Sequence, residues 1–428
     1  MTGRHVMFVL PRADWIAANE SLIAMLGGDA DVRVTVVAPQ GFAAPRSFGR
    51  ATLISYPFYA AAPTGSLLSR GREHIRAARE RRRLVDEALD AGRPDCIVVI
   101  SDTSRELVPF VDVARRRGIR VVFMQSVFLA RSIKQHVRRE NWQLIKSRGV
   151  AGLAMLVGLR GLQVMAGLPG SLFKRSAVGA SSDAVFTINE HQRDVLSETV
   201  PSNRMYATGT PLLDFLRSTV VDAPKRSGRE AFCASLGLDV DRPIVAYFSK
   251  SLAQFCHATP DVERDAQEFF VTTILQQLPA ANVVVKLHPI EDDGAFQAFA
   301  GNPRVRVVKE LDGHALIHHA NLVISLGPST PAFHALFHDR PRLIISRIGD
   351  IVLDYQRDLL DVSVAVASRE EYSAALEELK NAEWPRRLSP RFQSTAGQLE
   401  RFTEGFDGAA TLRVHSRLRE WLGLPAAV

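Results

Sequence analysis

Residues 282–289, NVVVKLHP, form a short apolar run that ends in a histidine and a proline. A run of this kind, bounded by turn residues, is typical of a strand buried on both faces in a parallel sheet. The pattern recurs on both sides of this stretch, with helical spacing between the runs. The further runs are Pro243–Ser249, Val305–Val308, Asn321–Ser325 and Arg342–Ser346. Together they predict an α/β unit with a parallel sheet.

The first half of the chain carries the same alternation of strands and helices. Its strand candidates are His5–Pro11, Val32–Pro39, Asp95–Asp102, Ile119–Ser126 and Asp183–Asn189. Asp14–Leu26 and the charged stretch Arg70–Ala91 are helix candidates. We therefore expect two doubly wound, Rossmann-like α/β domains that face a central cleft, because open α/β sheets bind ligands at the carboxyl ends of their strands.

A boundary between the two domains is predicted near the middle of the chain. Thr219–Gly228 is polar and contains proline and glycine, as linkers commonly do. We therefore expect an N-terminal domain at 1–222 and a second domain at 223–400.

The composition limits the class of protein. Hydrophobic residues make up 46% and charged residues 23% of the 428 residues, which excludes a disordered, collagen-like or coiled-coil chain. The three cysteines form no CxxC pair, which argues against a disulfide scaffold or a thiolate zinc site. Charged residues follow the first apolar run too soon for a signal peptide, so we expect a cytoplasmic protein with reduced thiols.

The net charge of +7 favours an anionic partner. Nucleic acid, a phosphorylated substrate and an anionic membrane surface all fit this charge. The arginines of Arg70–Ala91 alternate with glutamates and have no aromatic residues among them, so we expect a solvated helix and no nucleic-acid binding.

His288 is the first candidate for chemistry. It ends a predicted strand, where its side chain would face a ligand, and Pro289 fixes the following turn. An imidazole can donate to a phosphate oxygen, or offset the charge of a leaving group when it is protonated. A histidine that only closes the loop fits the same spacing, and the spacing does not separate the two interpretations.

The second candidate is the turn 325–333, SLGPSTPAF. A turn rich in glycine and hydroxyl groups between a strand and a helix presents backbone N–H groups to an anion. Ser329 or Thr330 could cap the helix, contact a phosphate, or do both. No Gly-Lys-Ser/Thr follows, so the turn is not a Walker loop.

At these motifs the chain resembles the donor-nucleotide domain of GT-B glycosyltransferases, closest to bacterial capsule, teichoic-acid and sialyl- or Kdo-type transferases. The matching pieces of the second domain are Leu236–Asp241, Tyr247–Lys250, His288-Pro289, and Ala320–Ser325 followed by Ser329-Thr330 and Ala335-Leu336. Those of the first domain are Asp183–His191 and Thr208–Pro211. Asp407–Ala410 is similar to the start of a terminal helix, which implies that 401–428 crosses back onto the first domain.

The resemblance implies a role for each matching residue. His288, with Pro289, would contact the nucleotide phosphate, and Ser329 and Thr330 would bind phosphate beside Ser325. Ser249 and Lys250 would line the nucleotide side of the cleft. One departure is His334, which stands where many relatives carry the glutamate that holds the ribose.

The implied reaction is transfer of a sugar from a nucleotide-activated donor to a cell-envelope or polysaccharide acceptor, which could be lipid-linked. A CMP- or CDP-linked donor is favoured and a UDP-sugar is second, and no cofactor is expected. An inverting transfer needs a general base near the acceptor. Asp14 is favoured for this role, then Asp102, with Glu190 or His191 as further options, although aspartates here can also cap helices.

Two other functions stay open. One is an epimerase of the UDP-N-acetylglucosamine 2-epimerase type, which shares the architecture and needs no acceptor. The other is a protein without enzymatic activity that binds an anionic envelope polymer.

Two histidine pairs have i,i+4 spacing, His314/His318 and His334/His338. Such pairs can supply two ligands on one helix face. No HExxH pattern or acidic third ligand accompanies them, so we expect no metal site and a metal-independent reaction.

The segment 149–173 is almost entirely apolar or glycine and has basic flanks. Its glycines and Pro169 argue against a membrane-spanning helix. It is either a helical hairpin packed on the first domain or a surface that docks on anionic lipid at the inner face of the plasma membrane. Periodicity does not separate these two interpretations.

The lipid interpretation predicts that the protein floats with anionic vesicles at low salt and less at high salt. Each flanking Arg or Lys contributes about 1 kcal/mol near an anionic surface, and salt screens this attraction. Replacing Arg138, Arg139, Lys146 and Arg148 with Gln releases the protein from the vesicles. A wild-type protein that never floats is evidence for internal packing.

Overall fold

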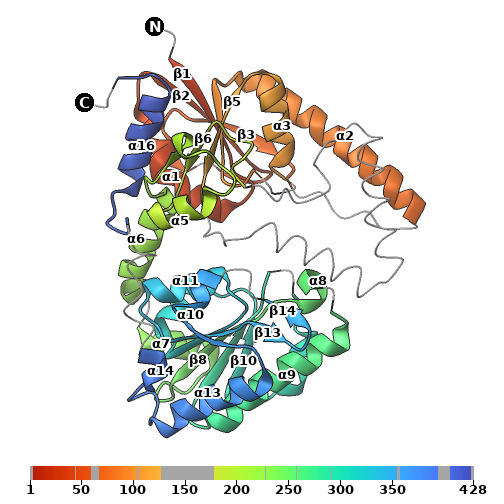
Figure 1. Cartoon of the computed structure of the whole chain (residues 1–428), viewed down its shortest axis with the longest axis vertical. Coiled ribbons are helices and arrows are strands. Elements are labelled where there is room, and N and C mark those ends of the chain that lie inside the picture. Colours follow the sequence, from red (N-terminus) through yellow and green to blue (C-terminus); the bar gives the residue numbers. More distant parts are fainter. Residues whose placement is uncertain are drawn as a thin grey trace. The chain divides into compact units, whose positions relative to one another are not determined.

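The computed structural model describes residues 3–43, 45–58, 67–102, 104, 106–126, 178–226, 228–256, 258–289, 291–353, 357–393 and 405–425. These residues form two compact units (Figure 1). Unit 1 holds the described residues up to Phe215 together with 405–425, and unit 2 holds those from Leu216 to Gln393. The apolar insertion 149–173, and with it the membrane prediction, lies outside the described residues.

Unit 1 contains a parallel sheet of seven strands in the order β3-β2-β1-β4-β5-β6-β7. The strands are β1 Arg4–Val9, β2 Val32–Pro39, β3 Thr52–Tyr56, β4 Cys96–Val99, β5 Arg120–Met124, β6 Ala184–Phe186 and β7 Met205–Tyr206. The helices are α1 Ala13–Gly28, η1 Arg46–Phe48, α2 Leu67–Gly92, α3 Val108–Arg116, α5 Glu190–Leu196, η2 Ser202–Arg204, α6 Pro211–Arg226 and α16 Ala410–Trp421. The central strands are buried because each lies between two neighbours and under helices.

Unit 2 contains a parallel sheet of six strands in the order β10-β9-β8-β11-β12-β15. The strands are β8 Ile244–Phe248, β9 Asn282–Lys286, β10 Val305–Val308, β11 Leu322–Leu326, β12 Arg342–Ile345 and β15 Val364–Val366, with the separate hairpin β13 Arg347–Ile348 and β14 Ile351–Val352. The helices are α7 Arg229–Leu236, α8 Leu252–Cys256, α9 Pro260–Gln277, η3 Gly294–Phe299, α10 Gly313–His319, α11 Thr330–Phe337, α12 Arg357–Leu360, α13 Arg369–Asn381 and α14 Pro390–Gln393.

The sheet of unit 2 is buried on both faces because the side chains of each strand alternate. Val245 and Tyr247 of β8 pack in one hydrophobic cluster, whereas Ile244, Ala246 and Phe248 pack in the other. This alternation between two apolar layers explains why the strands appear in the sequence as unbroken apolar runs. The predicted fold class, two doubly wound Rossmann-like domains, is confirmed for each unit.

Most of the predicted linker Thr219–Gly228 is helical. α6 continues to Arg226, and the division between the units falls between Phe215 and Leu216 inside this helix. Pro224 lies in the last turn of α6, where it precedes the helix end instead of preventing the helix. Strands β3, β7 and β15 are also absent from the predicted set, because they are short or only partly buried.

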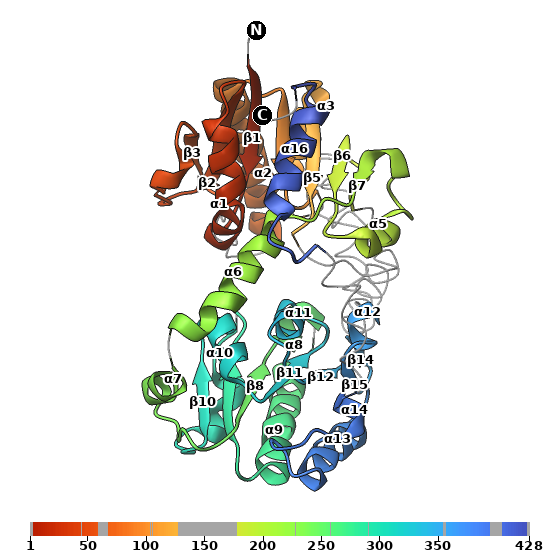
Figure 2. The same cartoon turned by 90° about the vertical axis from the view of Figure 1, so that its left-hand side faces the viewer.

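The terminal helix α16 belongs to unit 1, where it packs beside α1 (Figures 1 and 2). The carboxylate of Asp214 on α6 accepts the amides of Ala410 (3.1 Å) and Thr411 (2.7 Å), which caps the start of α16. At Gly209 the chain comes so close that a Cβ atom would lie 2.8 Å from Ala410 Cβ. The positive φ of Gly209, 75°, adds a second reason for glycine at this position.

No helix among the described residues is both long enough and apolar enough to cross a membrane.

Candidate functional site

The strand order of unit 2 reverses its direction between β8 and β11. At such a switch point the loops after the two strands lead to opposite faces and leave a crevice at the carboxyl edge. The register is level here, because Phe248 pairs with Ser325 on one side and with Lys286 on the other. Ser325 therefore lies near the end of β11, and Ser249 and His288 follow the neighbouring strands β8 and β9, at one edge of the sheet.

The turn after β11 is held by its own hydroxyl groups. Ser325 Oγ donates to the carbonyl of Gly327 (2.7 Å) and lies 2.6 Å from Ser329 Oγ. Gly327 has a φ of 70°, which an L side chain adopts with strain. Ser329 is the N-cap of α11, but its side chain makes no capping hydrogen bond. Thr330 is exposed, so the first turn of α11 presents hydroxyl and amide groups at the surface, as an anion site requires.

The loop after β9 contains a buried acid that the sequence analysis did not single out. Glu291 is 6% exposed, and its Oε2 accepts Ser249 Oγ (2.6 Å) and the His288 amide (2.9 Å). Burial raises the pKa of Glu291 above its ordinary value, and the two donors oppose this shift only in part. In the sequence Glu291 is one of three consecutive acidic residues, with Asp292 and Asp293, and nothing local marks it as the buried one.

Side chains of α9 form hydrogen bonds to the segment after β8. Glu263 accepts the amides of Leu252 (2.9 Å) and Ala253 (3.1 Å), which satisfies the start of α8. Gln267 accepts from the hydroxyl of Tyr247 (2.6 Å) through its side-chain oxygen. Ser249 and Lys250 therefore lie on a loop whose backbone is fixed by buried polar side chains.

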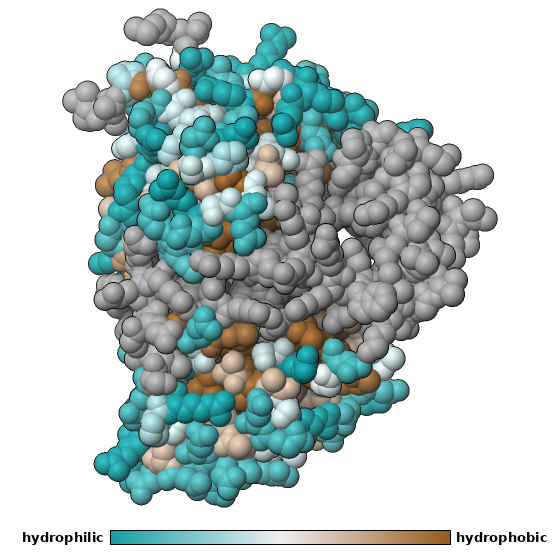
Figure 3. Space-filling view, in the orientation of Figure 1, coloured by the Kyte–Doolittle hydropathy of each residue, from teal (hydrophilic) through white to brown (hydrophobic). Residues whose placement is uncertain are grey.

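Hydrophobic surface accompanies these polar groups. In Figure 3 hydrophobic residues of unit 2 gather at the end where Figure 1 draws α8 and α11. Ligand sites commonly combine apolar walls with a few fixed polar groups. The carboxyl edge of unit 2 has both.

Between α10 and α11 lies a cluster of four histidines, formed by His314 and His318 of α10, His334 of α11 and His338, which caps the end of α11. The ring of His314 stacks on that of His334 at 4.2 Å between centroids, and its Nδ1 lies 3.2 Å from His338 Nε2. Burial, followed by the neighbouring histidines, lowers the pKa of His338 to about 3 and that of His334 well below its usual range. His334 therefore contributes to packing between α10 and α11.

Among the described residues, no group of three or more His, Cys, Asp or Glu side chains is arranged to hold a metal ion. The histidine cluster is a packed contact between α10 and α11.

The carboxyl edge of unit 1 carries the candidate bases. Asp14 is exposed in the first turn of α1 after β1, where it pairs with Arg12 at 2.8 Å. Asp102 is fully buried, and its Oδ1 accepts the amide of Gly179 (3.0 Å), which favours a structural role. Glu190 is exposed and pairs with Arg193, and His191 follows it on α5. Asp14 is thus the more accessible of the two favoured candidates.

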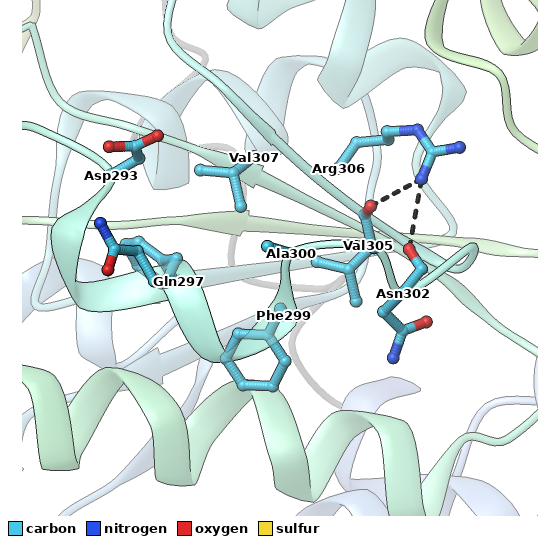
Figure 4. A pocket seen from close by; sticks show the side chains of 10 residues that line it. Asp293, Gln297, Phe299, Ala300, Asn302, Val305, Arg306 and Val307 are labelled. Atoms are coloured by element: carbon cyan, nitrogen blue, oxygen red, sulfur yellow. Dashed lines mark hydrogen bonds between the residues drawn. The ribbon is translucent and has the colours of Figure 1, made fainter.

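A cavity of about 310 Å³ lies elsewhere on unit 2, beside η3 and β10 (Figure 4). Arg306 lines it, but its guanidinium donates to the carbonyls of Leu236 (2.6 Å) and Val305 (2.8 Å). The cavity therefore lies along an edge strand whose arginine is already engaged by backbone.

No family model matches the sequence, and no curated protein matches it. Solved structures do match it. A Staphylococcus aureus MnaA–UDP structure covers 99% of this chain and 100% of its own, with a TM-score of 0.63 and 13% identity. A UDP-GlcNAc 2-epimerase from Neisseria meningitidis bound to UDP-GlcNAc covers 97% and 100%, with a TM-score of 0.63 and 14% identity.

A glycosyltransferase of kitacinnamycin matches over 98% of this chain and 99% of its own, with a TM-score of 0.59 and 16% identity. The chain has the fold of these enzymes. The two Rossmann-like units therefore form the GT-B architecture that the sequence predicts. At identities of this size the likeness concerns the fold.

The histidine cluster predicts a pH dependence of stability. The unfolded chain binds protons near pH 6.5, whereas His334 and His338 stay neutral in the folded protein because burial lowers their pKa values. The free energy of unfolding therefore falls as the pH drops below about 6.5. Each such group contributes about 1.4 kcal/mol per pH unit. Urea unfolding at pH 7, 6 and 5 measures the slope, and His338→Gln makes it shallower. A slope that this substitution leaves unchanged contradicts the prediction.

Proposed function

We propose that the protein is an enzyme that binds a UDP-activated sugar at the carboxyl edge of unit 2. The observation that carries the proposal is the turn 325–330 at the start of α11, which lies at the switch point of a GT-B fold. The amides of Ser329 and Thr330 and the hydroxyl groups of this turn are donors that suit a phosphate group. His288 follows β9 at the same edge and supplies a further donor.

The proposal replaces the donor that the sequence favoured. CMP and CDP gain no support from the structures compared above, two of which name UDP or UDP-GlcNAc. His334 packs against His314, so the ribose contact must come from another residue in this protein.

For the reaction, we propose epimerisation of a UDP-N-acetylhexosamine first. The support is the structural likeness to an epimerase with bound UDP-GlcNAc, a likeness that extends over nearly the whole of both chains. Such a reaction acts on the nucleotide sugar alone, and the exposed carboxylate of Asp14 is our candidate for proton transfer.

Glycosyl transfer is the second candidate, supported by the likeness to a glycosyltransferase over nearly the whole chain. In that case Asp14 would deprotonate the acceptor hydroxyl. Ser249, Lys250, Ser329 and Thr330 would bind the same donor nucleotide in either reaction, and the proposal needs no metal because amides and His288 offset the phosphate charge.

The first test is a thermal-shift panel of UDP, CMP, CDP, GDP and ADP, followed by incubation with UDP-GlcNAc without an acceptor. We expect UDP to raise the melting temperature more than the other nucleotides, because the tightest ligand stabilises the folded state most. At 100 times its Kd a ligand contributes about 2.7 kcal/mol. Conversion of UDP-GlcNAc alone identifies an epimerase, and release of UDP only with an added saccharide identifies a transferase. A protein that no nucleotide stabilises but that retains an anionic polymer contradicts both reactions.

The second test is His288→Ala. Loss of one donor to a charge that develops in the reaction typically lowers kcat by about 10²–10³. We expect a loss of this size while the melting temperature falls by only a few degrees, since His288 is partly exposed. Full activity in the variant, or parallel losses of activity and melting temperature, would assign His288 to the loop alone.

A further inference from the structure

One buried carboxylate joins two loops of the candidate site. Glu291 Oε2 accepts the hydroxyl of Ser249, which follows β8, and the amide of His288, which follows β9. The distances are 2.6 Å and 2.9 Å, in the range of strong charge-assisted hydrogen bonds. The two loops therefore meet on a single oxygen atom.

The main chain of Glu291 is fixed as well. Its amide donates to the carbonyl of His288 (2.9 Å), and its own carbonyl accepts Lys309 Nζ (2.8 Å) from the segment after β10. Glu291 thus contacts the loops that follow three neighbouring strands, β8, β9 and β10. A shift of this one residue would move all three.

The burial of Glu291 separates positioning from direct catalysis. At 6% exposure the carboxylate does not reach a ligand at the surface of the edge. Burying a charged group is costly unless it is well bonded, yet Oε1 has no hydrogen-bond partner among the described residues. The carboxylate is therefore a poor choice for stability alone, and its bonding geometry is the property that the site uses.

We propose that Glu291 is a positioning residue, which holds Ser249 and His288 at the spacing that a nucleotide diphosphate requires. This inference takes its ligand from the proposed function. The hydrogen bonds of Glu291 to the two loops do not depend on that function. Since both donors use Oε2, a glutamine can present its carbonyl oxygen to both and place its amide where Oε1 lies. The shape of the side chain at position 291 and its acceptor oxygen, more than its charge, determine the spacing of Ser249 and His288.

The experiment compares Glu291→Ala, Glu291→Gln and Ser249→Ala in the full chain. UDP affinity is measured by titration calorimetry, and hydrogen exchange of the peptide around His288 is measured without ligand. We expect Glu291→Ala to weaken UDP binding about 10-fold or more and to speed exchange at His288. Glu291→Gln stays within about threefold of the wild type, and Ser249→Ala falls between the two.

A matched control is Asp214→Ala in unit 1. Asp214 is also a carboxylate that accepts two groups, the amides of Ala410 and Thr411, but it belongs to unit 1 and caps α16. Its loss lowers the melting temperature and leaves UDP affinity unchanged. If Glu291→Ala and Asp214→Ala weaken UDP binding equally, general destabilisation explains the effect and the proposal is overturned.

Three further outcomes test the positioning role of Glu291. If Glu291→Gln is as damaging as Glu291→Ala, charge and not position matters, and the proposal is wrong. If Glu291→Ala does not fold, wild-type UDP affinity in Ser249→Ala overturns it. If the wild type binds no UDP, the proposed function fails separately, and unchanged exchange at His288 in Glu291→Ala then refutes the positioning role.

Discussion

The level register of β11, β8 and β9 is the constraint on which the candidate site depends. Ser325, Phe248 and Lys286 lie side by side across three strands, so the chain leaves all three at the same height. Each of the following loops then needs only a few residues to reach the others. A slip of one residue would turn every side chain of a strand to the opposite face and would also move its loop along the edge. The two apolar layers that cover the sheet therefore fix the position of polar groups that they never touch.

The polar groups at this edge are supported at a cost to stability. Glu263, Gln267 and Glu291 are buried side chains that bond to loops, and an aliphatic residue in their places would bury more apolar surface. His334 and His338 add a second cost, because burial lowers their pKa values and keeps them neutral where the unfolded chain takes up protons. The buried acids and Gln267 hold the loops after β8 and β9, and the histidines pack between α10 and α11. Buried polar groups that concentrate at one edge of a domain are a physical mark of a site, since they hold geometry that packing alone does not specify.

The sequence was informative wherever one residue type had one structural meaning. Unbroken apolar runs such as residues 282–286 identified the central strands, because only strands buried on both faces have this pattern. The pattern failed for β7 and β15, which are two and three residues long and too short for any periodicity. The extension of α6 through Pro224 to Arg226 was not predicted either, because a proline near a helix end and a proline in a linker look alike in sequence. Glu291 escaped notice for a different reason. A charged residue in a loop is usually solvated, and its burial depends on contacts with Ser249 and Lys309, which are 42 and 18 positions away. Long-range contacts of this kind have no local signal.

The placement of α16 determines the order in which the chain can complete its parts. Val414, Leu418 and Leu422 belong to the hydrophobic core of unit 1, together with strands from the first 126 residues. The described residues of unit 2, 216–393, lie in the chain between the two segments that build unit 1. The core of unit 2 can therefore close during synthesis before α16 is available to pack beside α1. Unit 1 begins ahead of unit 2 in the chain but completes its core only after it.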